Sequence, residues 1–172
     1  MVIRHILILT LIFLLVSCSN KDKPLYEPSS KVEGYTIYKE GLDAFEKNDY
    51  FFASKKFDQA ELNFSSVDLA AKSALMSSFS LYAINFYDEA IDNLERFITK
   101  YPADKNIMYA NYLICIIYFE QISDEKKDLA PLIKAKEKIS FFIKNFPDTE
   151  YAFDLKFKKD LIENQLAAKE MY

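Results

Sequence analysis

Apolar residues from position 34 onward recur with the period of an α-helix and stop at regular intervals. Three segments, 50–64, 87–102 and 132–147, align on a column of alanines. Apolar residues, one of them alanine, fill the columns four and seven positions after the aligned alanine. The helix is expected to stop at the column twelve positions after it. The aligned alanines are Ala53, Ala90 and Ala135, and the end positions are Ser65, Pro102 and Pro147. The pattern predicts three equivalent helices that stop at the same register.

A further helix is expected before each of these segments. It carries a small residue where paired helices must approach closely: Gly41, Ser78 and Cys115, each 37 positions from the next. The chain is therefore predicted to be all-α, an α-solenoid of antiparallel helix pairs over residues 35–172. Its repeats cover about 35–68, 72–105 and 106–149, with a partial fourth at 150–172. The chain has only two glycines and five prolines, which also favours long helices over a turn-rich β fold.

This arrangement resembles the tetratricopeptide repeat, whose pattern has the same Gly/Ala, Ala and terminal Pro columns. The resemblance covers roughly residues 35–149. The chain differs from the pattern in lacking Trp, in its 37-residue spacing, and in an insertion at about 123–130 within the third repeat. This charged insertion is either a solvated connector between two helices or a loop that contacts a partner.

The last segment, 150–172, has an apolar stripe with no following segment to cover it. The stripe consists of Phe153, Phe157, Leu161 and Leu166. Solenoids usually finish with a helix whose outer face is polar. We expect the chain to be a shortened version of a longer solenoid, with a docking surface as the alternative.

The N-terminus has the layout of a secretory signal, with a basic start followed by an apolar run from Ile6 to Val16. Eleven helical residues span roughly 16 Å, about half of a bilayer core. Residues 15–18, Leu-Val-Ser-Cys, resemble the lipobox of bacterial lipoproteins. The resemblance implies a signal peptide at 1–17, a covalent lipid on Cys18, and outer-membrane sorting by Ser19. Residues 18–34 would then be a lipidated, flexible tether, unless the segment is an ordinary signal peptide with an accidental cysteine.

Processing at this site would remove His5, the only histidine, and leave Cys115 as the one free thiol. A Cys/His catalytic pair and a metal site built from His or Cys are then excluded by inventory. We expect no cofactor other than the covalent lipid on Cys18. The net charge of −4 and the presence of only two arginines argue against nucleic-acid binding.

In the tetratricopeptide fold, the first helix of each pair lines an inner groove. The resemblance therefore places a partner groove on twelve positions, eight of them aromatic, which suits peptides with apolar or aromatic anchors. They are Tyr35, Tyr38, Leu42 and Phe45 in the first repeat, Lys72, Leu75, Phe79 and Tyr82 in the second, and Tyr109, Tyr112, Ile116 and Phe119 in the third. Core packing between helices is the alternative role for several of them.

The lipobox, the proline-containing tether and the repeats together resemble the BamD family of outer-membrane assembly lipoproteins. The stretches 35–61, 87–122 and 146–171 carry this resemblance. It implies a non-enzymatic scaffold, lipid-anchored at the periplasmic face of the outer membrane. Its partners would be a BamA-type outer-membrane protein, accessory lipoproteins and unfolded outer-membrane protein segments.

Two other functional classes compete with this reading. One is another envelope lipoprotein of the same repeat type, associated with pilus biogenesis or with the Tol–Pal system. The other is an enzyme that uses paired carboxylates such as Glu40, Glu46 and Asp49 as acid and base. These carboxylates fall on expected helix surface and in a turn with no motif around them, so we expect no enzyme activity.

Overall fold

The structure is a computed structural model that describes residues 29–122 and 129–170. The expected signal peptide, Cys18 and most of the insertion at 123–130 lie outside these residues. The described residues form helices and contain no strand. The helices are α2 (Ser29–Glu46), α3 (Tyr50–Asn63), α4 (Val67–Ala83), α5 (Tyr87–Lys100), α6 (Ile107–Glu120), α7 (Ala130–Asn145) and α8 (Glu150–Glu170).

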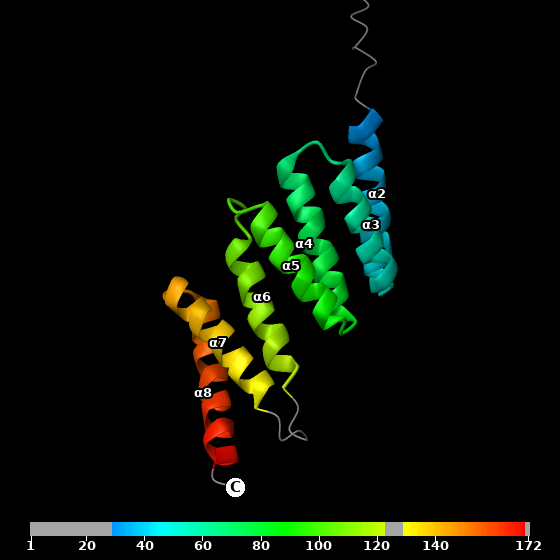
Figure 1. The fold of residues 1–172 in the computed structure, drawn as a ribbon. Coiled ribbons are helices and arrows are strands. Elements are labelled where there is room, and N and C mark those ends of the chain that lie inside the picture. The colour runs from blue at the N-terminus through cyan, green and yellow to red at the C-terminus, as the bar shows by residue number, and fades with distance from the viewer. Residues whose placement is uncertain (1–28, 123–128, 171–172) are drawn as a thin grey trace, which may run out of the picture.

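Consecutive helices pack side by side along the chain, so that the molecule is an elongated stack running from α2 to α8 (Figure 1). The pairs α2/α3, α4/α5 and α6/α7 correspond to the three predicted repeats, and α8 packs against α7. The predicted all-α solenoid is confirmed. None of the helices in the described part of the chain is both long and apolar enough to cross a membrane.

The alanine column forms the centre of the core. Ala53, Ala90 and Ala135 are fully buried. So are the larger side chains that follow them in the same columns, which are Phe57, Leu94, Phe97, Ile139 and Phe142. Full burial of a small side chain at one position of each repeat lets neighbouring helices pack closely there.

The small-residue column works as predicted in all three repeats. A Cβ on Gly41 would lie 2.8 Å from the Phe57 ring, closer than real Cβ contacts come. Ser78 is fully buried, and its hydroxyl donates to the Ala74 carbonyl at 2.9 Å. Cys115 is also buried. Close helix approach therefore explains why the three positions hold Gly, Ser and Cys.

The start of the solenoid differs from the prediction. Helix α2 begins at Ser29, so residues 29–34, assigned to the tether, are helical and that part of the boundary was wrong. The sequence pattern predicts that the helical region starts at Gly34. Instead it lies inside α2, where a Cβ would come within 2.9 Å of the Phe64 ring. The glycine permits close packing of α2 on Phe64 and does not begin the helix.

The turns inside the first two repeats share one geometry. Asn48 and Asn85 both have positive φ, 61° and 60°, the left-handed conformation that Asn tolerates better than most residues. A tyrosine two positions later donates its hydroxyl to each Asn side chain, at 2.7 Å for Tyr50 and 2.9 Å for Tyr87. The equal geometry of these turns gives the two helix pairs the same antiparallel arrangement.

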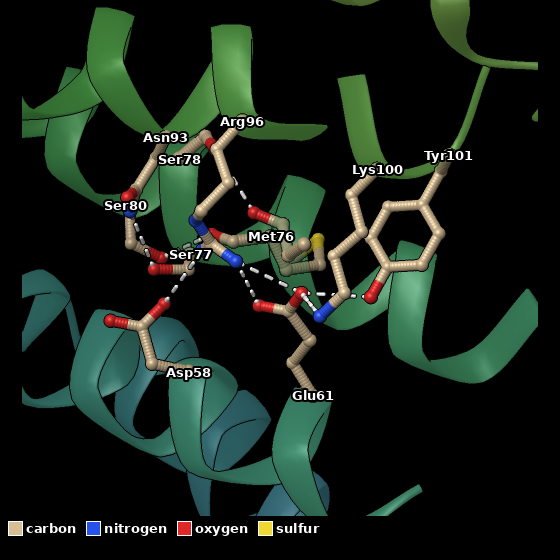
Figure 2. Close-up of polar contacts among 11 residues, drawn as sticks. Asp58, Glu61, Met76, Ser77, Ser78, Ser80, Asn93, Arg96, Lys100 and Tyr101 are labelled. Atoms are coloured by element: carbon tan, nitrogen blue, oxygen red, sulfur yellow. Dashed lines mark hydrogen bonds and ion pairs between the residues drawn. The ribbon is translucent and has the colours of Figure 1, made fainter. Parts of the chain in front are cut away.

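A buried carboxylate joins the first repeat to the second (Figure 2). Glu61 at the end of α3 accepts hydrogen bonds from Arg96 at 2.8 and 2.9 Å, Lys100 at 2.9 Å and Tyr101 at 2.7 Å. Burial raises the pKa of the Glu61 carboxyl, but the hydrogen bonds from Lys100, Arg96 and Tyr101 outweigh burial, so its pKa is lowered. Asp58 lies 3.8 Å from the same Arg96. We call Glu61, Arg96, Lys100 and Tyr101 the inter-repeat clamp.

Helix α8 buries one face and exposes another. Ala152, Leu155 and Ile162 are fully buried, and Lys136 on α7 pairs with Glu163 on α8 at 3.0 Å. Most of the predicted apolar stripe is exposed, with Phe153 at 70%, Phe157 at 65% and Leu161 at 40%. The exception is Leu166, which packs partly buried against the core. The stripe of α8 is therefore three residues long, not four.

Candidate functional site: an aromatic surface on α2, α4 and α6

The residues predicted to line a partner groove fall on the first helices of the repeats, α2, α4 and α6. Their exposure differs. Tyr35 and Lys72 are exposed and Ile116 is buried in the core, so Ile116 offers no open surface. The remaining residues are half-buried: Tyr38, Leu42, Phe45, Leu75, Phe79, Tyr82, Tyr109, Tyr112 and Phe119. Half-buried side chains suit both expected roles, core packing between helices and contact with a partner, because part of each packs on neighbours and part meets solvent.

A central aromatic cluster connects α2 to α4. The ring centroids of Phe45 and Phe79 lie 5.9 Å apart, and those of Phe79 and Tyr82 are also 5.9 Å apart. Tyr50 extends the cluster from Phe45 at 5.0 Å, and Tyr87 extends it from Tyr82 at 6.3 Å. These separations are typical of favourable aromatic pairs. The structure therefore joins the predicted residues of two repeats into one continuous surface.

Glu120 at the end of α6 links this cluster to the third repeat. It accepts a hydrogen bond from the Tyr82 hydroxyl at 2.9 Å, and the single proton of the Tyr87 hydroxyl is shared between Glu120 at 3.1 Å and Asn85 at 2.9 Å. Burial and the hydrogen bond to Glu120 raise the pKa of Tyr82 to about 12, and the same causes raise the pKa of Tyr87. Both phenols are therefore neutral at physiological pH, and their hydrogen bonds to Glu120 fix the orientation of the two rings.

A second aromatic cluster lies between α6 and α8. Tyr112 and Tyr151 have ring centroids 4.5 Å apart, and Tyr109 lies 6.2 Å from Tyr151. The Tyr112 hydroxyl donates to Asp154 at 2.9 Å, and burial together with this bond raises the Tyr112 pKa. Helix α8 thus continues the surface that begins on α2.

The α2 end of the surface is packed on its own repeat. Tyr35 meets Phe64 edge-on at 5.2 Å, and Tyr38 lies 5.3 Å from Phe57. The Lys72 ammonium sits over the Tyr38 ring at 5.4 Å, a cation–π contact between the first two repeats. Tyr38 therefore contributes mainly to packing, whereas Tyr35 keeps 48% of its surface exposed.

A cavity of about 640 Å³ opens beside Lys72 and Leu75, between the start of α4 and the segment that joins α5 to α6. Its lining also includes Asp68, Leu69, Met76, Ala103, Asp104, Lys105 and Asn106. Four apolar and five polar residues line it, a mixture that suits an anchoring side chain with a polar group at its end. Two of the predicted groove positions thus border a real concavity.

Sequence reasoning missed Tyr50, Tyr87, Tyr151, Glu120 and Asp154 as members of this surface. A signal for two of them was present, because Tyr50 and Tyr87 occupy the same column of the repeat alignment, three residues before the alanine. The carboxylates gave no such signal. Their partners lie 38 and 42 positions away, and only the folded arrangement of α4 beside α6 and of α6 beside α8 brings them together.

The surface has groups for packing and hydrogen bonding and little for chemistry. Burial raises the pKa of the Cys115 thiol to about 12, which leaves the reactive thiolate scarce. Over the described residues, no group of three or more His, Cys, Asp or Glu side chains is placed to hold a metal ion. The arrangement suits the binding of apolar or aromatic side chains.

Three comparisons place the chain among known proteins. A family model described as an outer membrane lipoprotein, YfiO, matches residues 31–172. The outer membrane protein assembly factor BamD of Caulobacter vibrioides is 36% identical over 135 residues, which is 78% of this chain and 44% of that protein. The same factor of Rickettsia prowazekii is 35% identical over 136 residues, or 79% of this chain and 54% of that protein. The chain spans about half the length of these curated relatives.

Among solved structures, the C-terminal TPR-containing domain of a Plasmodium falciparum FK506-binding protein matches with a TM-score of 0.55. It is 19% identical, and the match covers 87% of this chain and 98% of that one. At this identity the match bears on the fold alone. It confirms the tetratricopeptide-like solenoid predicted from the repeat columns.

Proposed function

Because this chain belongs to the YfiO family of outer membrane lipoproteins, whose curated relatives include BamD proteins, we propose that it is a scaffold of outer-membrane protein assembly. The resemblance to the BamD family predicted from the sequence is thereby confirmed. In this role the chain holds unfolded outer-membrane protein segments and docks to a BamA-type protein and accessory lipoproteins. It performs no catalysis.

The observation that carries the proposal is the row of aromatic side chains on α2, α4 and α6, joined by ring contacts between α2 and α4 and by the hydrogen bond from Tyr82 of α4 to Glu120 of α6. Strands of outer-membrane β-barrels alternate apolar and polar side chains and carry aromatic residues near the membrane interfaces, so an unfolded segment offers repeated apolar anchors for such a surface. Rings held by Glu120 and Asp154 are ordered before any partner arrives, which reduces the entropy lost on binding. The cavity beside Lys72 and Leu75 adds a recess for one anchor at the edge of this surface.

The location follows from the N-terminal motif. A lipid on Cys18 would anchor the chain at the periplasmic face of the outer membrane, with the solenoid held near the membrane by a tether. Several acyl chains on one cysteine give stable anchoring, where a single chain gives only marginal binding. A scaffold for outer-membrane proteins must act at that surface.

A pull-down from envelope extracts tests the partner assignment. The full chain with a C-terminal affinity tag should recover a BamA-type protein after mild crosslinking. Recovery of a pilus secretin or Tol components without a BamA-type protein would favour the other envelope lipoproteins and contradict the proposal. A variant carrying Tyr82→Ala and Phe79→Ala serves as a matched control for segments bound at the aromatic surface.

A further inference from the structure

The second helices of neighbouring repeats meet at two junctions, which we call the first and second grooves, and the repeat alignment allows them to be compared position by position. The first groove lies between α3 and α5 and the second between α5 and α7. An offset of 37 relates α3 to α5 and an offset of 45 relates α5 to α7, because Ala53, Ala90 and Ala135 share one column. In the first groove the inter-repeat clamp joins the two walls.

Every member of the clamp is replaced in the second groove. Ile98 stands where the first groove has Glu61, and Phe141 stands where it has Arg96. The other two donors also disappear, since Asn145 and Phe146 occupy the places of Lys100 and Tyr101. A coordinated loss of acceptor and donors leaves no buried charge unpaired and places apolar side chains at three of the four positions.

The second groove is also open. A cavity of about 310 Å³ lies between α5 and α7, lined by Ile98, Ile114, Cys115, Phe141 and Phe142 together with Glu95, Thr99, Asn111 and Lys138. Phe141 keeps 59% of its surface exposed, so its ring does not close the gap that Arg96 bridges in the first groove. The described polar link across the rim is the ion pair from Lys138 to Glu95, at 3.1 Å.

A second cavity continues the groove toward the start of α5. It measures about 500 Å³ and is lined by Asp88, Ile91 and Asp92 of α5, Tyr118 and Gln121 at the end of α6, and Ala130, Pro131 and Lys134 of α7. The two cavities run from Asp88 to Thr99 along α5, which corresponds to roughly 16 Å or three helical turns. Helix α6 forms the floor of both.

The two walls of this groove carry opposite charge. The α5 wall presents Asp88, Asp92 and Glu95, whereas the α7 wall presents Lys134 and Lys138. Both lysines hold their ammonium groups over the Tyr118 ring, with Nζ 4.9 and 5.5 Å from its centroid, so cation–π contacts fix these positive charges on the α7 side of the groove. An occupant must therefore match an acidic wall on one side and a basic wall on the other.

We propose that the α5–α7 groove binds an amphipathic α-helix of a partner protein. The helix is about three turns long, with two apolar anchors for the two cavities, a basic flank toward α5 and an acidic flank toward α7. A helix fits because its apolar stripe lies between two polar flanks that can differ in charge. The groove uses a different face of α6 from the aromatic surface, so this site goes beyond the proposed function and is independent of it.

The test uses the full chain in a mild detergent and a designed, lactam-stapled helical peptide. The peptide carries leucines at positions 3 and 10, lysines on one flank and glutamates on the other. We expect its binding to shift the amide signals of Ile98, Ile114 and Phe141. Two otherwise equal peptides, one with both flanks acidic and one with both basic, should bind more weakly; equal binding of all three would overturn the proposal.

Two matched variants sharpen the result. Phe141→Ala should weaken binding by at least about tenfold, whereas Phe153→Ala on α8 removes an equally exposed ring and should leave it unchanged. Installing the residues of the first groove by Ile98→Glu with Phe141→Arg should abolish binding and preserve the helical circular dichroism. Shifts confined to the aromatic surface or to α8 would contradict the proposal. If the chain forms a dimer and Phe141→Ala abolishes that dimer, the groove binds a second copy of the chain, which would also contradict the proposal.

Discussion

Glu61 occupies the interior between two repeats, and three side chains from α5 and its C-terminal end donate to it. Replacing Glu61 by Gln keeps the volume and removes the charge that Arg96 and Lys100 neutralise. We expect the free energy of unfolding to fall by about 1–3 kcal/mol, because hydrogen bonds to a charged group are lost in a buried site. Glu95→Gln, in the more exposed pair with Lys138, should change it by less than about 1 kcal/mol. Urea unfolding followed at 222 nm measures both.

The same substitution has a defined pH dependence. The folded pKa of Glu61 is below the ordinary value of 4.5, so the carboxylate stabilises the fold above pH 4.5, and this contribution is lost as the pH falls through the folded pKa. The stability difference between the native chain and Glu61→Gln should therefore be constant near neutral pH and shrink below pH 4.5. A difference that grows on acidification would contradict the assignment of the clamp.

Tyr82 provides a test at the alkaline end. Its pKa is about 12 in the fold and 10 when exposed, so the neutral phenol stabilises the fold below pH 10 and the contribution is lost between pH 10 and 12. In absorbance titration at 295 nm, Tyr82→Phe should remove one phenol from the late-titrating group. The chain has no Trp, so tyrosinate dominates this signal. Loss of a phenol from the early-titrating group would show that Glu120 does not hold Tyr82.

At the scale of elements, the helices could be predicted from periodicity and the repeat columns. The alanines, the small residues and the following Phe and Leu positions report core packing directly, because each repeat needs the same close approach. The start of α2 could not be found in this way. In the sequence alone, a glycine at position 34 is equally consistent with the end of a tether and with close packing inside a helix. Only its contact with the Phe64 ring in the fold shows that the second explanation holds.

Part of the candidate surface could also be predicted from the repeat columns. Residues on one face of α2, α4 and α6 follow from the repeat resemblance, but which of them are open depends on contacts between repeats. Ile116 is buried although it has the register of a groove residue. The inter-repeat clamp was not predicted at all, since Glu61 meets donors 35 to 40 positions away across an interface whose register the sequence does not reveal.

Helix α8 offers a test of which face does the packing. Leu155 is fully buried, so Leu155→Ala should lower the free energy of unfolding by about 2–4 kcal/mol through lost burial and the cavity left behind. Phe153→Ala removes a larger side chain that is mostly in water, and we expect a change within about 0.5 kcal/mol. Comparable losses for the two variants would mean that the stripe of α8 is covered in the folded chain.

At the scale of the whole molecule, the lipobox interpretation of the N-terminal motif predicts where the solenoid acts. Cys18→Ala removes the thiol that would receive the lipid, so the precursor should stay uncleaved and unlipidated. Mass spectrometry of the N-terminus and membrane fractionation check this outcome. Normal fractionation of Cys18→Ala with the outer membrane would refute the lipobox interpretation. Ser17→Thr, a small change beside the cysteine, serves as the matched control.

The proposed role rests on a single property of the molecule, the ability of the aromatic surface to hold an unfolded segment. The most direct measurement is titration of the isotopically labelled full chain with a peptide that ends in an aromatic residue. The account predicts shifted amide signals at Tyr38, Phe79 and Tyr112, and smaller shifts when the terminal aromatic is replaced by Ala. Shifts confined to α3, α5 and α7 would contradict it.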